Sequence, residues 1–290
     1  MKSTLNLAKR VILIFFRDKS NVFFSLLGSI IMLMLYMLFL GSAWTNSETQ
    51  AIMPGYIQMQ NQWLMAGIVY ITCFSTSINA MGQLPYDYQG RISDDLNVTP
   101  IARGKIVTGY VIGAFVCSAV MTILTILFTY GYLLVKSFDL PSVGQTFLVL
   151  LAALLCIIMN CAFGFLLASL TSSPRSFGSV GSVLLTLIGF LIGVYVPIGA
   201  MGKTTQAVMT LLPFSHGASL LRLPFTHETL ALATTPQSQP ILQGVREFLG
   251  IDLVINSFKI QPWMSVLYML VLSLVLITIS SMRISKSRKV

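Results

Sequence analysis

Long uncharged, apolar segments alternate with short charged ones along most of the chain. The chain holds no charged residue from Gln50 through Tyr86 and none from Ile106 through Val135. A helix needs about 20 apolar residues to cross the hydrocarbon core of a membrane. Six segments meet that length, at residues 22–40, 62–82, 106–135, 143–170, 177–195 and 262–282. The pattern predicts an all-α integral membrane protein with six transmembrane helices.

Residues 3–19, ahead of the first span, place apolar and cationic side chains at helical spacing on different sides. The apolar side holds Leu5, Ala8, Ile12, Phe15 and Phe16, and the polar side holds Asn6, Lys9, Arg10 and Arg17. Such an amphipathic helix is expected to lie in the cytoplasmic membrane interface. The alternative is a flank that only supplies positive charge to orient the first span. No small-residue cleavage site follows the first apolar run, so we expect a retained anchor.

The second predicted span is unusually polar. Its polar residues are Thr72, Ser75, Thr76, Ser77 and Asn79. Polar groups within a membrane need partners, so these side chains should face protein or a cavity rather than lipid. They either line a path through the protein or form hydrogen bonds between helices with no further role.

Residues 86–105 form a charged island between two spans, with six charged side chains in twenty. Within it, residues 91–98 are predicted to form a short amphipathic helix at the membrane surface. That helix should end at Thr99 and Pro100, because the residue before a proline avoids helical dihedral angles.

Residues 199–261 hold no segment long enough to cross a membrane. Two short apolar pieces, residues 207–212 and 218–223, are separated by residues 213–217, which include Pro213 and Gly217. Two re-entrant helices on one membrane face are the expected structure. Residues 224–259 are predicted to form an external loop.

The composition agrees with a membrane protein, because 55% of residues are hydrophobic and only 9% are charged, against about 25% in soluble domains. The net charge of +9 would suit nucleic acid, but Lys and Arg gather beside the apolar spans. The proposed inner side carries 13 of the 18 cations, as the positive-inside rule requires. Both termini are therefore expected in the cytoplasm, and no nucleic-acid partner is expected.

Few residues suggest catalysis or metal binding. The four cysteines lie in apolar segments and the two histidines are eleven positions apart, so we expect neither a disulfide nor a metal site. Gly202, Lys203 and Thr204 suggest a phosphate loop, but residue 197, where its first glycine belongs, is Pro197. The chain is therefore expected to bind no nucleotide and to be no enzyme. No carboxylate lies at membrane depth, which disfavours a proton-coupled transporter.

The segment at 86–105 resembles the cytoplasmic coupling segment of type-2 ABC exporter permeases. The matching positions are Gly90, Asp94, Asp95, Leu96, Thr99, Pro100, Arg103 and Lys105. The family usually has a glutamate just ahead of that glycine, where this chain has Tyr88 and Gln89. Further resemblance lies in the N-terminal helix, the end of the fourth span at 164–170, the glycine-rich fifth span, and Leu212, Pro213 and Phe214 in the re-entrant region.

The resemblance implies the permease subunit of an ATP-driven exporter in the cell membrane, a bacterial inner membrane or plasma membrane. A second permease, identical or paralogous, would complete the path, and separate ATPase subunits would bind ATP and Mg, with no cofactor on this chain. It assigns coupling to Gly90, Arg91, Asp94, Asp95, Leu96, Thr99, Pro100 and Arg103, and the interfacial helix to Lys9, Arg10, Phe15, Phe16 and Arg17. Path candidates are Thr72, Ser75, Thr76, Asn79, Gly181, Gly189 and Gly193. The alternatives are a non-transporting membrane anchor or assembly subunit, and an ATP-independent secondary transporter.

Overall fold

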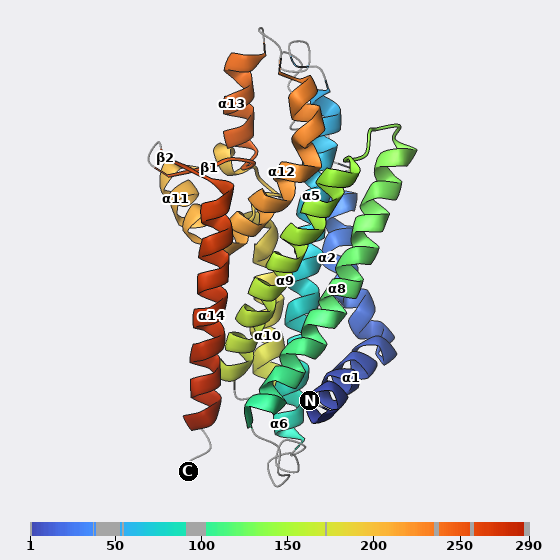
Figure 1. Ribbon diagram of the computed structural model, residues 1–290, viewed down its shortest axis with the longest axis vertical. Helices are drawn as coiled ribbons and strands as arrows, with labels where there is room; N and C mark the ends of the chain where they lie inside the picture. Colours follow the sequence, from blue (N-terminus) through green and yellow to red (C-terminus); the bar gives the residue numbers. More distant parts are fainter. Residues whose placement is uncertain are drawn as a thin grey trace.

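The fold is a bundle of long helices that run close to one common axis (Figure 1). The computed structural model describes residues 2–36, 38, 53, 55–90, 103–171, 173–234, 238–255 and 258–286. Its helices are α1 (Lys2–Arg17), α2 (Lys19–Leu35), α5 (Tyr56–Met81), α6 (Gln83–Gln89), α8 (Arg103–Val135), α9 (Val143–Leu170), α10 (Pro174–Leu191), α11 (Lys203–Leu211), α12 (Pro213–Leu232), α13 (Gln239–Phe248) and α14 (Pro262–Lys286). β1 (Leu253–Ile255) and β2 (Phe258–Ile260) form an antiparallel hairpin, with Leu253 opposite Ile260.

The two ends of the bundle differ. One end carries α11, α13 and the hairpin, and the other carries α1 and α6 (Figure 1). We call them the α13 end and the α1 end.

Within the described residues, five helices are long and apolar enough to cross a membrane, counting α5 and α6 as one helix from Tyr56 to Gln89. A sixth is obtained if α1 and α2, which meet at an angle of 75°, form one broken span. The fold is thus that of an all-α membrane protein with five or six membrane-capable helices.

α5 is the central helix of the bundle. Its most apolar stretch is 94% buried, against 22% for α14 at the periphery. The helices packed around it are α2, α8, α9, α10 and α12. Because neighbours cover nearly all of α5, its polar residues face protein or a cavity, as the polar sequence of this segment predicts.

α1 packs against α8 at two glycines four residues apart. A Cβ atom on Gly109 would lie 2.9 Å from the Leu7 Cβ, and one on Gly113 would lie 2.7 Å from the Val11 Cβ. Small residues at such spacing let two helices approach closely. This close packing holds α1 against the start of α8.

Several helix boundaries differ from the sequence-based predictions. α5 begins at Tyr56 instead of residue 62, and α6 prolongs it to Gln89, so residues 86–89 of the charged island are helical. α10 ends at Leu191 instead of residue 195, because the chain turns at Gly193, whose φ of 69° suits glycine.

The break predicted at 213–217 lies instead at Leu212, which is extended and separates α11 from α12. α12 begins at Pro213, which fits a first helical turn, and continues through Pro224 to Leu232. The residues expected to form a loop beyond it hold the end of α12, α13 and the hairpin. The predicted helix at 91–98 lies outside the described residues.

The α1–α8 contact predicts a clear difference between two glycines of α8. Replacing Gly113 with alanine forces Val11 or the helix to shift and should destabilise the protein by about 1–3 kcal/mol. Gly131→Ala meets no atom within 4 Å and should be neutral or stabilising by up to about 1 kcal/mol. Thermal unfolding of the purified protein in detergent measures both, and equal midpoints would show that the helices do not pack as described.

Candidate functional site

A buried carboxylate, Asp87 on α6, is the centre of a polar cluster at the α1 end. Its side chain is only 1% exposed. Arg10 donates two hydrogen bonds to it, from Nη1 to Oδ2 at 2.5 Å and from Nη2 to Oδ1 at 2.9 Å. Gln83 donates to Oδ1 at 2.7 Å, and the hydroxyl of Tyr110 donates to Oδ2. With four donors, the hydrogen-bonding capacity of the carboxylate is used in full.

The cluster joins three elements that are far apart in the sequence. Arg10 belongs to α1, Asp87 to the continuation of α5, and Tyr110 to α8. α6 ends and α8 begins on either side of residues 91–102. The three side chains therefore link α1 to both helices that border the charged island.

Sequence analysis placed Arg10 on the amphipathic helix but assigned no role to Asp87 or Tyr110. No local spacing connects positions 10, 87 and 110, so the cluster could not be found from periodicity. One available indication was that Asp87 ends a long uncharged run, where an acid needs a partner.

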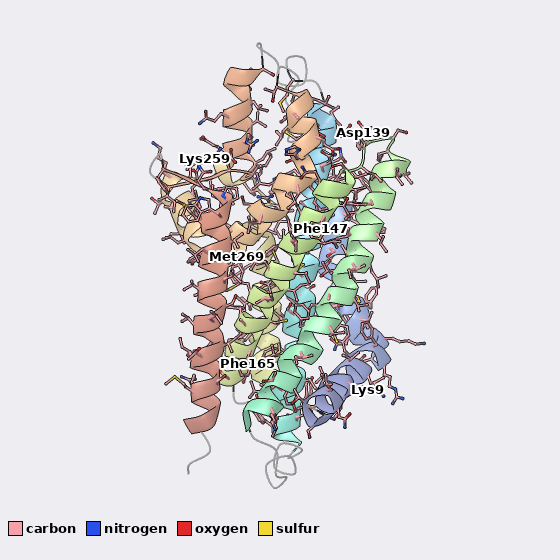
Figure 2. All side chains as sticks on the ribbon, in the orientation of Figure 1. Lys9, Asp139, Phe147, Phe165, Lys259 and Met269 are labelled. Atoms are coloured by element: carbon pink, nitrogen blue, oxygen red, sulfur yellow. The ribbon has the colours of Figure 1, made fainter. Side chains whose placement is uncertain are left out.

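The other residues of the interfacial helix divide between two faces of α1. Phe15 is buried, whereas Phe16 is 36% exposed and Leu5 is 55% exposed. The face that packs inside is formed by Leu7, Ala8, Val11 and Phe15. Leu5 and Phe16, on the predicted apolar side, lie outside this packing face. Lys9, at the edge of the bundle in Figure 2, and Arg17 are exposed.

Two of the path candidates on α5 are hydrogen-bonded inside the subunit. The hydroxyls of Thr72 and Ser29 lie 2.6 Å apart, and Thr125 donates to Thr72 at 3.3 Å. Ser75 donates to the carbonyl of Ser25. Thr76 is buried and has no hydrogen-bond partner among the described residues. Hydrogen bonds between helices therefore explain why polar residues occupy positions 72 and 75.

Asn79 and Gly181 instead meet at a hollow of about 620 Å³ at the α1 end. The hollow lies between the α1–α2 corner, α5, α6 and α10. Its wall combines aromatic and polar side chains, among them Phe15, Asp18, Phe24, Phe177 and Ser182. A cavity of this size and character suits an amphipathic molecule.

Gly189 and Gly193 lie near the opposite end of α10 and do not line this hollow. A Cβ atom on Gly189 would lie 2.3 Å from the ring of Tyr195. These two glycines thus allow the chain to fold back on α10.

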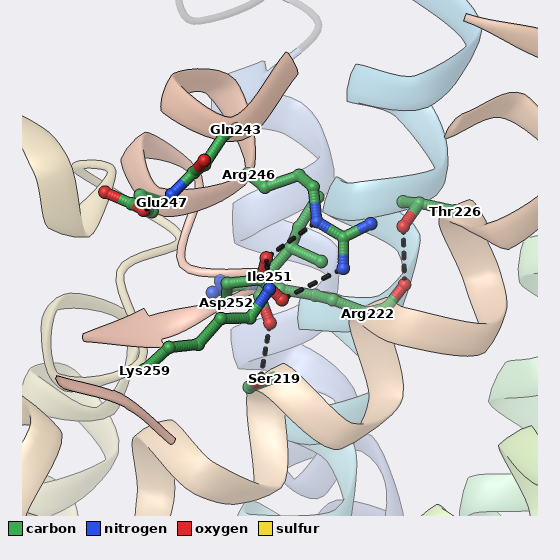
Figure 3. Close-up of polar contacts among 9 residues, drawn as sticks. All are labelled: Ser219, Arg222, Thr226, Gln243, Arg246, Glu247, Ile251, Asp252 and Lys259. Carbon is green, nitrogen blue, oxygen red and sulfur yellow. Dashed lines mark hydrogen bonds and ion pairs between the residues drawn. The ribbon is translucent and has the colours of Figure 1, made fainter. Parts of the chain in front are cut away.

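At the α13 end, Asp252 receives hydrogen bonds from two cations (Figure 3). Arg246 donates at 2.7 and 2.9 Å and Lys259 at 2.7 Å. Burial raises the pKa of Asp252, but the bonds and charges of both cations outweigh burial and hold the pKa below its usual range. These ion pairs join α13 to both strands of the hairpin.

Two motifs of the re-entrant region have structural explanations. Lys203 is the first residue of α11 and follows a 3-10 turn at Ile198–Ala200 rather than a strand. His216 bonds through one ring nitrogen to Ser265 and through the other to the Thr210 carbonyl, each at 2.8 Å. Within the described ranges, no group of three or more His, Cys, Asp or Glu side chains could hold a metal ion.

Most of the predicted coupling residues fall outside the described residues. They are Arg91, Asp94, Asp95, Leu96, Thr99 and Pro100. Gly90 directly follows α6, and Arg103 is the first residue of α8.

Comparison with known proteins finds one family. The family described as ABC-2 type transporter matches residues 3–225, from the start of α1 into α12. The match covers well over half of the chain and includes Arg10, Asp87 and Tyr110. No curated protein matches the chain.

The Arg10–Asp87 pair predicts strong coupling between two substitutions. Arg10→Met leaves a buried carboxylate without its cation and should cost on the order of 2–4 kcal/mol of unfolding free energy. Asp87→Asn should cost less in the presence of Arg10→Met than alone, because the pair is already broken. The neighbouring control Lys9→Met should stay within about 0.5 kcal/mol of wild type. Denaturation of the four variants in detergent gives this double-mutant cycle, and additive effects would contradict the ion pair.

Proposed function

Because the chain belongs to the ABC-2 type transporter family, it is a transporter permease, and we propose that it is the membrane-spanning half of an ATP-driven exporter. In this proposal a second permease, identical or paralogous, completes the path. Separate ATPase subunits bind ATP and Mg and act on residues 86–105. The chain itself binds no cofactor and hydrolyses no nucleotide.

The observation that carries the proposal is the buried cluster of Arg10, Asp87 and Tyr110. It connects α1 to the two helices that flank residues 91–102. A partner that displaces this segment must therefore move the end of α6, the start of α8 and α1 together. Conversion of a partner's motion into a shift of packed helices is a common mode of conformational coupling.

The central position of α5 supports transmission of that motion into the bundle. α6 continues α5, and α5 is bonded to its neighbours by Thr72 to Ser29 of α2 and by Ser77 to Ser118 of α8, at 2.9 Å. Displacement at the α1 end would thus be shared by several helices.

The exposed face of α10 supports pairing with a second permease. Only 28% of this helix is buried, and small polar side chains, Ser179, Ser182 and Thr186, are exposed on it. Hydroxyl-bearing side chains are more typical of helix contacts or a water-filled path than of a lipid-facing surface. The hollow at Gly181 opens beside the same helix, so we infer that α10 borders the path.

Disruption of the coupling segment should separate the permease from its ATPase. Leu96→Asp would put an unpaired charge into an apolar contact, so transport and ATPase co-purification should each fall by about tenfold or more. The matched control is Leu232→Asp, at an exposed leucine at the end of α12, which should leave both unchanged. Equal membrane abundance of both variants is required. Normal co-purification with Leu96→Asp would exclude the coupling assignment and favour an anchor or an ATP-independent transporter.

The orientation is tested independently of transport. In a cysteine-free background, Gln50→Cys and Gln237→Cys should react with a membrane-impermeant thiol reagent in intact cells. Ser93→Cys should react only after the cells are opened, because the cation asymmetry places residues 86–105 inside. Labelling of Ser93→Cys in intact cells would reverse the orientation.

A further inference from the structure

Arg222 on α12 is a fully buried arginine that forms no salt bridge among the described residues. Its Nη2 donates to the carbonyl of Ile192 at 2.7 Å. Its Nη1 lies 3.1 Å from the carbonyl of Leu249 and 3.2 Å from that of Gly250. The guanidinium also stacks over the ring of Trp63 at 5.0 Å. Figure 3 draws Arg222 together with the separate ion pairs of Asp252.

These contacts join four parts of the chain that are remote in sequence. Arg222 lies on α12, Ile192 just after α10, Leu249 and Gly250 between α13 and β1, and Trp63 on α5. The indole of Trp63 adds a bond of its own to the Leu249 carbonyl at 2.7 Å. A planar guanidinium presents five donors in a fixed fork that can reach carbonyls on separate segments, whereas the ammonium of lysine is a compact point charge with three donors.

Burial of this charge without a counterion is unfavourable. Burial lowers the pKa of Arg222 to about 9, which leaves the group charged at neutral pH. Its Nε has no hydrogen-bond partner among the described residues. An apolar side chain could fill this volume without that desolvation. Filling this space is therefore not enough to explain an arginine here, and the hydrogen bonds of the guanidinium must have a role of their own.

What it provides is an attachment for one end of α10. The same end is held by Ser215 of α12, whose hydroxyl donates to the Leu191 carbonyl at 2.8 Å. Val194 packs tightly on α5, since a Cβ atom on Gly67 would lie 2.4 Å from its Cγ2. The opposite half of α10 borders the hollow at Gly181. α10 is thus bound firmly at the α13 end and faces open space at the α1 end.

We propose that Arg222 is the positioning residue that joins this end of α10 to α12 and the α13–β1 turn, so that they move as one unit. The proposal rests on the proposed function, which assigns the transport path to α10. When the α1 end is displaced, α10 then pivots about Ile192. The hollow at Gly181 changes in size, whereas the α13 end keeps its shape.

The test measures how well the end of α10 is protected, without ATP, substrate or partner. Val194→Cys is introduced into a purified cysteine-free protein in detergent, and its reaction with a maleimide is timed. Val194 is 1% exposed, so the parent should react slowly. Arg222→Met should accelerate labelling by about tenfold or more, a loss of about 1.4 kcal/mol of protection. Arg222→Lys keeps the positive charge but not the planar fork of donors. The labelling rate of Val194→Cys in this variant should therefore lie between those of the parent and Arg222→Met.

Two controls separate this role from general destabilisation. Arg246→Met removes an ion pair of the same region that does not touch α10, and should leave labelling of Val194→Cys within about twofold of the parent. A second reporter, Ala153→Cys on α9, is also buried and should stay protected in Arg222→Met.

Several outcomes would overturn the proposal. They are parent-like labelling of Val194→Cys in Arg222→Met, equal acceleration by Arg246→Met, and equal exposure of Ala153→Cys. If Arg222→Met does not accumulate, parent-like protection in Arg222→Lys would overturn it. Because no ATPase takes part, a failure here differs from a failure of the coupling proposed for residues 86–105.

Discussion

The structure depends on one constraint, that polar groups buried away from water need hydrogen-bond partners. α5 is surrounded by protein and carries more polar residues than an ordinary span. Thr72 and Ser77 find their partners on α2 and α8. Each such bond fixes the rotation of α5 relative to a neighbour, since turning the helix would leave a buried hydroxyl unpaired. The polar sequence of α5 thus specifies the arrangement of the bundle as well as its centre.

The same constraint explains why several helices contribute side chains to the candidate site around Asp87. A carboxylate as buried as Asp87 is tolerable only with a cation and further donors, and its partners come from α1, α6 and α8. Removing α1 or α8 would leave an oxygen of the carboxylate without one of its donors. The cluster therefore makes the position of α1 dependent on the helices that flank the charged island, which is what a unit that receives motion from a partner requires.

Much of the fold could be predicted from the sequence, because helix length and apolar composition are local properties. α9 spans the predicted residues 143–170, and α14 begins at the predicted Pro262. The prediction failed for α12, which contains Gly217 and Pro224 although both residues disfavour a continuous helix. Most of that helix is buried, and packing against α5 and α9 outweighs the local preferences of these residues. The partners of Asp87 could not be predicted, because Arg10 is 77 positions away and no local pattern pairs them.

The two buried arginine contacts lie at opposite ends of one continuous helical unit. Arg10 binds Asp87 near the end of α6, and Arg222 stacks on Trp63 near the start of α5. Arg10 is neutralised by a carboxylate and is one-third exposed, so its helix can respond to a partner in water. Arg222 is fully enclosed and bonded only to carbonyls, so its contacts resist rearrangement. In the proposed function, this asymmetry lets α5 and α6 receive motion at the α1 end while they stay anchored at the α13 end.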